Sequence, residues 1–256
     1  MPGFGGPTCL DGAVMESQNK LAATLGAEKG WYGVNGATGL LQAALLAIAK
    51  PKDYVLMPRN VHKSIIQACV LGDINPVFFD LPYLDDRGHY ISPDYCWFKS
   101  VLDQISQESI EISAVVLTNP TYQGYSSDLQ PLIQIIHSKG WPVLVDEAHG
   151  AHFSFSNDNK LPKSAINAGA DLVVHSLHKS SVGLVQTAAL WWQGRKVDPH
   201  IVEKSISLFQ TTSTSALLLA SCEAALTEWQ TNKGRNKLKA IIKNASANNL
   251  LNKIKR

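Results

Sequence analysis

The chain has 256 residues, 45% of them hydrophobic, which predicts one large globular domain with a substantial core and excludes intrinsic disorder. Its four cysteines lie far apart without a CxxC pair, which argues against a disulfide framework or a zinc ribbon and favours a reducing cytoplasm. The net charge of +2 is uneven, because residues 233–256 hold eight of the 23 basic residues and no acid, which leaves 15 basic against 21 acidic residues, a net charge of −6, before them.

Short β-rich segments alternate with helical segments along the chain. In chain order we predict a helix over 13–25, a helix over 39–49, a strand over 54–57, a helix over 62–71, strands over 76–79 and 113–118, a helix over 129–137, and strands over 142–146, 171–176 and 187–192. Short strands that are apolar on both faces and separated by helices are typical of a parallel sheet. The predicted fold class is α/β, with a mostly parallel central sheet and helices on both faces.

The two ends of the chain carry different signals. The start, MPGFGGPTCLDGAVMESQ, lacks the basic residues and apolar core of a signal peptide, and apolar runs elsewhere are too short for a bilayer. We therefore expect a soluble cytoplasmic protein. The basic end is either a tail that binds nucleic acid or a membrane, or a solvated amphipathic helix, and apolar residues at helical spacing favour the helix. These residues are Leu238, Ile241, Ile242 and Ala245.

Polar segments follow the predicted strands. In open parallel sheets, ligands bind beyond the carboxyl ends of the strands. Five segments occupy such positions: VNGATG (34–39), RNVHKS (59–64), NPTYQG (119–124), DEAHG (146–150) and HSLHKS (175–180). We expect these five segments to converge at one edge of the sheet.

The segment NGATG (35–39) is a turn of small residues in front of a predicted helix. Free N–H groups at a helix start bind phosphate, and the Thr38 hydroxyl can add a contact. The alternative is that Thr38 is an ordinary N-cap. The segment matches neither GxGxxG nor GxxxxGK[ST], so a dinucleotide or nucleoside triphosphate site has no direct support.

Asp146 ends an apolar strand, where an ionised carboxylate is costly without a positive partner. A protonated heteroaromatic nitrogen would be such a partner; the alternative is an Asp that caps the next turn. The pairs His149/His152 and His175/His178 have HxxH spacing and raise a metal site. No cysteine accompanies them and neither pair forms HExxH, so we predict no metal.

Lys179 follows another predicted strand, beside His178. A partly desolvated lysine there can have a lowered pKa and attack an aldehyde; the alternative is a rim lysine paired with an acid. A phosphate-binding turn, a carboxylate and a lysine, each after a strand, together indicate a site for pyridoxal 5′-phosphate (PLP).

Six motifs carry a resemblance to a known family. They are GVNGATG (33–39), VLMPRNVHKS (55–64), NPTYQG (119–124), VDEAHGAHF (145–153), DLVVHSLHKS (171–180) and QTTSTSALLLAS (210–221). Their order and sequence resemble the major domain of the Orn/Lys/Arg decarboxylases, a branch of the fold type I PLP enzymes. The resemblance covers nearly the whole chain and implies the PLP-binding fold of that domain.

The resemblance also implies roles for single residues. Lys179 would bind PLP covalently, and His178 would donate a proton or contact the substrate carboxylate. Asp146 would pair with the pyridinium nitrogen. His62 would stack on one face of the ring, with Ala148 on the other, so that the implied catalytic residues are Lys179, His178, Asp146 and His62.

The implied phosphate site consists of Ala37, Thr38 and Ser176. The chain departs from the family pattern in this site, because Ala37 replaces the usual serine of the turn. It also has Thr214 and Ala216 where the family has a proline and an aromatic residue, in a segment expected at a dimer interface.

The activity implied by the resemblance is PLP-dependent decarboxylation of arginine, lysine or ornithine, which releases CO2 and a polyamine precursor. Shorter bacterial members of the family make arginine the preferred candidate. A homodimer or higher homo-oligomer is expected, without a membrane or nucleic-acid partner. The same site residues would serve a PLP-dependent aminotransferase or lyase, and those activities stay open.

The predicted domain organisation has three parts. Residues 1–30 lead into the major domain, residues 31–231 form the PLP-binding major domain, and residues 232–256 form a basic helical tail that starts a missing C-terminal domain. Compared with the family, the chain looks truncated at both ends. A truncated, inactive cofactor-binding remnant is therefore a further alternative.

Overall fold

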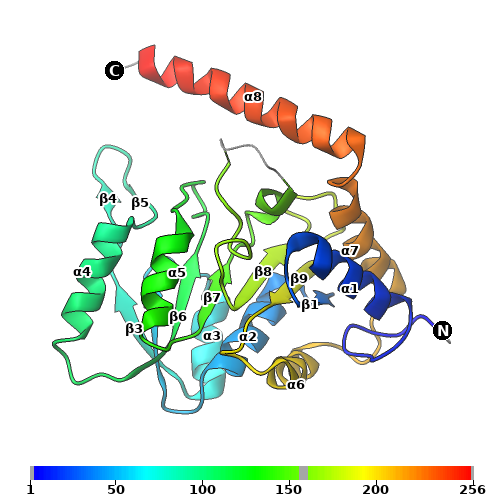
Figure 1. Cartoon of the computed structure of the whole chain (residues 1–256), viewed down its shortest axis with the longest axis horizontal. Coiled ribbons are helices and arrows are strands. Elements are labelled where there is room, and N and C mark those ends of the chain that lie inside the picture. Colours follow the sequence, from blue (N-terminus) through cyan, green and yellow to red (C-terminus); the bar gives the residue numbers. More distant parts are fainter. Residues whose placement is uncertain (1–2, 156–160, 255–256) are drawn as a thin grey trace.

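A seven-stranded sheet with helices on both faces forms the centre of the molecule (Figure 1). The computed structural model describes residues 3–155 and 161–254, with side chains described through residue 244. Outside the sheet, β4 (Tyr83–Leu84) and β5 (His89–Tyr90) form a separate two-stranded pair.

The sheet is mostly parallel, as predicted. Its strands are ordered β1 (Lys29–Gly33), β9 (Ala188–Trp192), β8 (Leu172–Ser176), β7 (Val143–Asp146), β6 (Ile112–Thr118), β2 (Tyr54–Pro58) and β3 (Asn75–Phe79). The five strands from β8 to β3 pair in parallel, whereas β9 is antiparallel to both of its neighbours. The predicted α/β fold class is confirmed.

Two hydrophobic cores lie on opposite faces of the sheet. The first core receives α1 (Ala13–Leu25), α4 (Tyr95–Ile105), α5 (Leu129–Ser138) and α7 (Ala216–Glu228). The second receives α2 (Gly36–Ile48), α3 (Lys63–Gly72) and α6 (Pro199–Phe209). Successive strand residues point to opposite faces, so in β6 Val115 and Leu117 join the first core while Ala114 and Val116 join the second. Strands buried on both faces explain the continuous apolar runs in the sequence.

The helix starts follow from capping side chains. In five helices the residue before the first turn accepts a hydrogen bond from a backbone N–H of that turn, which satisfies one of its free donors. These residues are His62 before α3, Asp94 before α4, Asp128 before α5, Asp198 before α6 and Ser215 before α7.

One predicted helix start is wrong. Helix α2 begins at Gly36 rather than at residue 39, so Ala37 and Thr38 lie in its first turn. Asn35 occupies the N-cap position without a side-chain cap, so Thr38 is not the N-cap. Gly36 has a φ of 72°, a left-handed conformation that glycine adopts at no steric cost, and this lets the chain turn directly from β1 into the helix.

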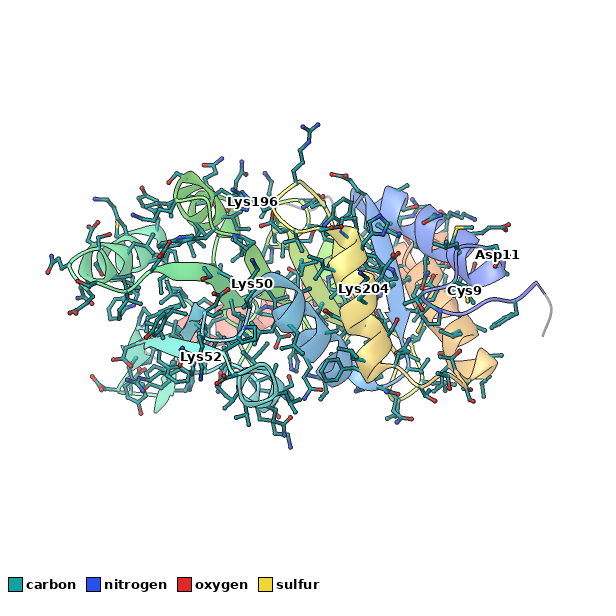
Figure 2. All side chains as sticks on the ribbon, turned by 90° about the horizontal axis from the view of Figure 1, so that it is seen from below. Cys9, Asp11, Lys50, Lys52, Lys196 and Lys204 are labelled. Atoms are coloured by element: carbon teal, nitrogen blue, oxygen red, sulfur yellow. The ribbon has the colours of Figure 1, made fainter. Side chains whose placement is uncertain are left out.

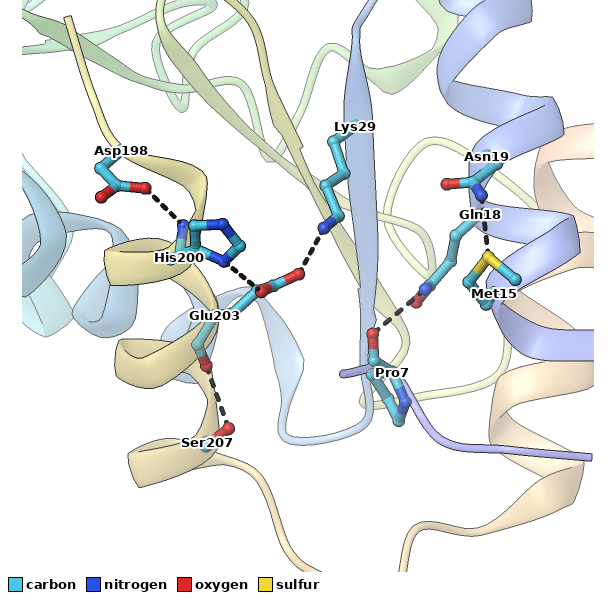
Figure 3. A network of polar contacts seen from close by, with 9 residues as sticks. All are labelled: Pro7, Met15, Gln18, Asn19, Lys29, Asp198, His200, Glu203 and Ser207. Carbon is cyan, nitrogen blue, oxygen red and sulfur yellow. Dashed lines mark hydrogen bonds and ion pairs between the residues drawn. The ribbon is translucent and has the colours of Figure 1, made fainter. Parts of the chain in front are cut away.

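Side chains on both faces hold the edge strand β1 (Figure 3). Lys29 forms an ion pair with Glu203 of α6, with 2.5 Å between Nζ and Oε1. Gln18 of α1 accepts a hydrogen bond from the Tyr32 backbone N–H at 2.8 Å and donates one to the Pro7 carbonyl at 3.1 Å. These contacts tie the N-terminal residues to the sheet.

Helix α8 (Asn232–Ile254) extends from the end of α7 along the top of the molecule in Figure 1. A small third core anchors its first half, formed by Trp229, Leu238 and Ile242 with Phe155 and Leu161. The predicted amphipathic helix is confirmed for Leu238 and Ile242, whereas Ile241 is 49% exposed. The side chain of Ala245 lies outside the described residues.

Basic side chains also occur away from α8. Figure 2 labels four exposed lysines on the side of the molecule seen from below. They are Lys50, Lys52, Lys196 and Lys204. Among the described residues, no helix is both long and apolar enough to cross a membrane.

Candidate active site

A cavity of about 140 Å³ opens where β7, β8 and the start of α2 meet. Its lining consists of Gly36, Ala37, Thr38, Leu41, His62, Asp146, Ala148, Ser176, His178 and Lys179. All eight site residues predicted from the sequence are among them. The lining comes from four of the five polar segments that follow strands.

The fifth segment, NPTYQG (119–124), lies beside the cavity but does not line it. The Asn119 N–H donates a hydrogen bond to the Asp146 carbonyl at 3.0 Å, which continues the pairing of β6 with β7. The exposed Tyr122 ring meets the edge of His149, with ring centroids 5.6 Å apart. The five segments thus lie at one edge of the sheet, as expected, and this segment contacts residues of the site from outside the cavity.

The first turn of α2 forms one wall of the cavity. The Gly36 N–H donates to the Gln186 carbonyl at 2.8 Å. The N–H groups of Ala37 and Thr38 belong to the first helical turn, where no intrahelical acceptor exists. With the positive end of the helix dipole and the Thr38 hydroxyl, this wall suits an anion.

Asp146 lies at the end of β7 and is 6% exposed. Its Oδ1 accepts a hydrogen bond from the Ala148 N–H at 3.1 Å. Burial raises the pKa of the Asp146 carboxyl, and this effect exceeds the opposing effects of the Ala148 N–H, Lys179 and His62. A cationic or N–H-bearing ligand in the cavity would therefore stabilise the ionised carboxylate.

The His62 ring is fixed by the start of α3. Its Nδ1 accepts a hydrogen bond from the Ser64 N–H at 3.2 Å and lies 2.8 Å from the Ser64 hydroxyl. Because Nδ1 is an acceptor, the neutral ring carries its proton on Nε2. His62 thus presents a ring of defined orientation to the cavity.

Lys179 lies three residues beyond β8 and is exposed, so the expectation of a partly desolvated lysine is wrong. Its Nζ lies 3.1 Å from Nε2 of His149. Burial lowers the pKa of His149, and the charges of Lys179 and His62 lower it further. A neutral His149 can accept a hydrogen bond from the ammonium group. The sequence reasoning missed this role, although the position of His149 in the turn after β7 was a usable signal.

The other histidines of the two HxxH pairs point to different surroundings. His178 is half-buried, with Nδ1 3.3 Å from the Ser176 hydroxyl. His152 packs against the Phe153 ring, and His175 lies buried against Glu147. Within residues 3–155 and 161–254 there is no group of three or more His, Cys, Asp or Glu residues that could hold a metal ion.

The donor set of the cavity fits PLP. An anion-binding wall, a buried carboxylate, an oriented ring and a primary amine match the phosphate, ring nitrogen, ring face and aldehyde of this cofactor. The residues present are therefore chemically suited to the cofactor.

Comparison with protein families gives a match over residues 8–256, to the family described as "Orn/Lys/Arg decarboxylase, major domain". The arginine decarboxylase of Bacillus cereus is 36% identical over 217 residues, which cover 84% of this chain and 45% of the relative. An uncharacterised Bacillus subtilis protein, YaaO, is 33% identical over 84% of this chain and 44% of its own length. The chain thus spans less than half the length of these relatives.

Solved structures show the same fold. The constitutive lysine decarboxylase of Escherichia coli superposes with a TM-score of 0.81 at 21% identity, covering 96% of this chain and 35% of that one. The serine palmitoyltransferase of Sphingomonas wittichii gives a TM-score of 0.66 at 20% identity, covering 89% of this chain and 54% of that one. At these identities the likeness concerns the fold alone.

Proposed function

Because the chain belongs to the Orn/Lys/Arg decarboxylase family, a family of PLP-dependent amino-acid decarboxylases, we propose that Lys179 binds PLP and that the site decarboxylates a basic amino acid. The observation that carries the proposal is the single cavity that joins Lys179, the Asp146 carboxylate and the first turn of α2. Arginine is the first substrate to test, because the 36% identical relatives are named arginine decarboxylases.

Each wall of the cavity has a proposed role in holding the cofactor. The Ala37 and Thr38 N–H groups, with the Thr38 and Ser176 hydroxyls, bind the phosphate. His62 packs on one ring face, and the small Ala148 side chain leaves room at the other. Bound PLP supplies an electron sink for the electron pair left when CO2 departs. The first turn of α2 would thus hold the phosphate end of the cofactor, and His62 and Ala148 would orient its ring.

Asp146 holds the proton on the ring nitrogen. Its carboxylate is buried, so an N–H donor directed at it forms a charge-assisted hydrogen bond without competition from water. This contact favours the ionised state that burial disfavours. Asp146 would thereby keep a ring nitrogen protonated near neutral pH.

Two histidines lie beside Lys179 and have separate proposed roles. Neutral His149 accepts a hydrogen bond from the Lys179 ammonium group, which orients Nζ for bond formation. His178 is the proposed donor to the α-carbon of the product, and Lys179 is the alternative donor. Both assignments use residues on loops at the edge of the sheet, where a substrate can enter.

Absorbance tests cofactor binding. The purified protein with PLP should show a band at about 420 nm that is lost in Lys179→Ala. Lys163→Ala is the matched control, because exposed Lys163 contacts Gln130 and does not line the cavity. A wild-type protein without the band would contradict the proposal, and a band that persists in Lys179→Ala would contradict the role of Lys179.

Product analysis tests the reaction. Holoprotein is incubated with arginine, lysine or ornithine, and CO2 and the corresponding amine are measured. Release from one of the three supports decarboxylation. A protein that binds PLP but releases CO2 from none of them would refute decarboxylation by this chain, and assays for amino-group transfer would then separate an aminotransferase from cofactor binding alone.

We also propose that the chain forms a homodimer or a higher homo-oligomer. The loop that follows Lys179 exposes Val182, Leu184 and Val185, and the segment 208–217 exposes Leu208 and Leu217. Exposed apolar side chains near a site support a protein interface there. The segment is also the one expected at the subunit interface from its sequence.

A further inference from the structure

A buried polar cluster lies on the face of the sheet opposite the cavity. Successive strand residues point to opposite faces, so Asp146 and Ser176 face the cavity while Glu147 and His175 point away from it. Trp191 of β9 has its indole ring in the core on that side. All three cluster side chains, Glu147, His175 and Trp191, are at most 1% exposed.

Hydrogen bonds join the three side chains in series. The Trp191 Nε1–H donates to Nδ1 of His175 at 3.0 Å. Nε2 of His175 lies 2.8 Å from Oε2 of Glu147. The other carboxylate oxygen, Oε1, accepts from the Ala165 N–H at 2.8 Å. The cluster therefore links β9, β8, the residue that follows β7, and the segment around Ala165.

These contacts determine where the protons are. An indole N–H can only donate, so Nδ1 of His175 carries a lone pair and the imidazole proton is on Nε2. The ring is therefore neutral and donates to Glu147. Both oxygens of Glu147 thus face N–H donors, and protonation would add a further donor to a buried group that is surrounded by donors.

Other titratable groups around the cluster act on its charge. Burial raises the pKa of the Glu147 carboxyl, nearby Asp146 adds to this effect, and His175 and the Ala165 N–H oppose it. On the short helix Ala151–Phe155, His152 faces His175, and burial lowers the pKa of His152 to about 4. A neutral His152 places no positive charge beside His175. The hydrogen bonds, rather than neighbouring cations, therefore hold the charge on Glu147.

We propose that Glu147 is an ionised positioning residue whose charge state is held by Trp191 through the neutral ring of His175, and that it fixes the strand ends presenting Asp146 and Ser176. The Glu147 carbonyl also accepts the Gly150 N–H at 2.9 Å, closing the turn that carries His149. A Cβ at Gly150 would lie 2.6 Å from Cγ of Glu147, so the side chain and the turn fit only together. The expected effect of Glu147 on PLP binding rests on the proposed function, whereas the charge state of Glu147 does not.

Nitrogen NMR of histidine-labelled protein without cofactor tests the state of the His175 ring at neutral pH. The ring should show Nε2 protonated and Nδ1 unprotonated. Trp191→Phe removes the N–H that occupies Nδ1 and keeps an aromatic ring, so rings with a proton on Nδ1 should appear. Trp192→Phe is the matched control, because Trp192 donates to the Val197 carbonyl instead. A proton on Nδ1 of His175 in the wild type would overturn the proposal even if Trp191→Phe does not fold.

PLP binding tests the positioning role. In Glu147→Gln the amide NH2 must face one of the two N–H donors, so the strand ends should shift and PLP affinity should fall by about tenfold or more, as when the supporting partners of metal ligands are removed. Unchanged PLP affinity in a folded Glu147→Gln variant would refute the positioning role. Failure of the wild type to bind PLP would instead contradict the proposed function and leave the NMR result valid.

Discussion

At the scale of single residues, the buried surroundings of Asp146 disfavour its ionised carboxylate. Its burial raises its pKa, and the Ala148 N–H, Lys179 and His62 offset this effect in part. A group held in an unfavourable state in the folded protein reduces stability, and such groups concentrate at functional sites. The cost is expected to vanish when a proton donor binds in the cavity.

Asp146→Asn should therefore stabilise the cofactor-free protein. Because the folded pKa lies above the unfolded one, the folded protein binds more protons between the two values, and the free energy of unfolding falls as pH rises through that window. Above the window the substitution should raise the free energy of unfolding by about 0.5–2 kcal/mol. Urea denaturation at neutral and acidic pH measures the difference, which should shrink in acid. A destabilised variant at neutral pH would contradict this account.

His149→Phe should slow the capture of PLP by Lys179. Phenylalanine keeps a ring against Tyr122 but removes the acceptor 3.1 Å from Nζ. We expect a decrease of about tenfold in the rate at which the 420 nm band appears, because a hydrogen bond to a charged group contributes roughly 1.5–3 kcal/mol. Stopped-flow absorbance measures the rate. Tyr122→Phe serves as the control and should leave it nearly unchanged; an equally slow control would show that the effect is steric.

The sequence predicted which residues line the cavity but not all of their contacts. All eight predicted residues line it, because each lies at or after the end of a strand and parallel strands end at one edge. His149 was seen only as half of a metal-type spacing, since its contact with Lys179 joins two loops 30 residues apart. The exposure of Lys179 was missed for a similar reason, because it depends on where the loop lies relative to the sheet.

At the scale of elements, edge strand β1 shows why short strands are hard to predict. Its sequence KGWYG contains two glycines, and strand preference is weak without side chains to pack. Gly30 is explained by Trp191, because a Cβ at residue 30 would lie 2.3 Å from the indole ring. The strand is thus selected by its neighbour across the sheet rather than by its own composition.

Gly30→Ala should destabilise the protein by about 1–3 kcal/mol, because the buried Trp191 ring cannot move away. Thermal or urea unfolding measures the change. The control is Gly39→Ala in α2, where an added Cβ meets nothing closer than 3.4 Å and helix propensity favours alanine by about 1 kcal/mol. If Gly30→Ala were as stable as the wild type, the Trp191 ring would have to move away from the added Cβ, contrary to this expectation.

The same reasoning explains which elements the sequence could predict. The four predicted helices and six predicted strands all exist, with ends within three residues, because each has apolar periodicity or a continuous apolar run. Helices α4, α6 and α7 were not identified. In α7 the apolar residues surround the helix instead of forming one stripe. The antiparallel direction of β9 could not be read either, because it depends on pairing with β1 and β8.

At the scale of the whole molecule, the exposed apolar residues around the site offer a test of association. Val185→Asp places a charge in the proposed interface, where Val185 is 72% exposed in the single chain, and should shift the protein toward monomer. Sedimentation velocity measures the shift. Val70→Asp is the control, because Val70 is 79% exposed on α3 and does not belong to this patch. A wild type that is monomeric at micromolar concentration would contradict the proposed homodimer.

The expected cytoplasmic location, the absence of nucleic-acid binding and the three-part division of the chain stay predictions. All four cysteines are free, two buried and two exposed, which suits a reducing compartment. The basic residues occur on α8 and on the opposite side of the molecule (Figure 2).

The alternation of faces along β7 and β8 has a consequence for how this stretch tolerates change. From Asp146 to Ala148 and from Val174 to Ser176, each side chain belongs either to the cavity or to a core. A library of every single substitution should therefore give two kinds of defective variant at alternating positions. Substitutions at cavity positions should fold but not retain the cofactor. Substitutions at core positions should not accumulate as folded protein. The first kind should continue past the strand ends, because Ala148, His178 and Lys179 also line the cavity.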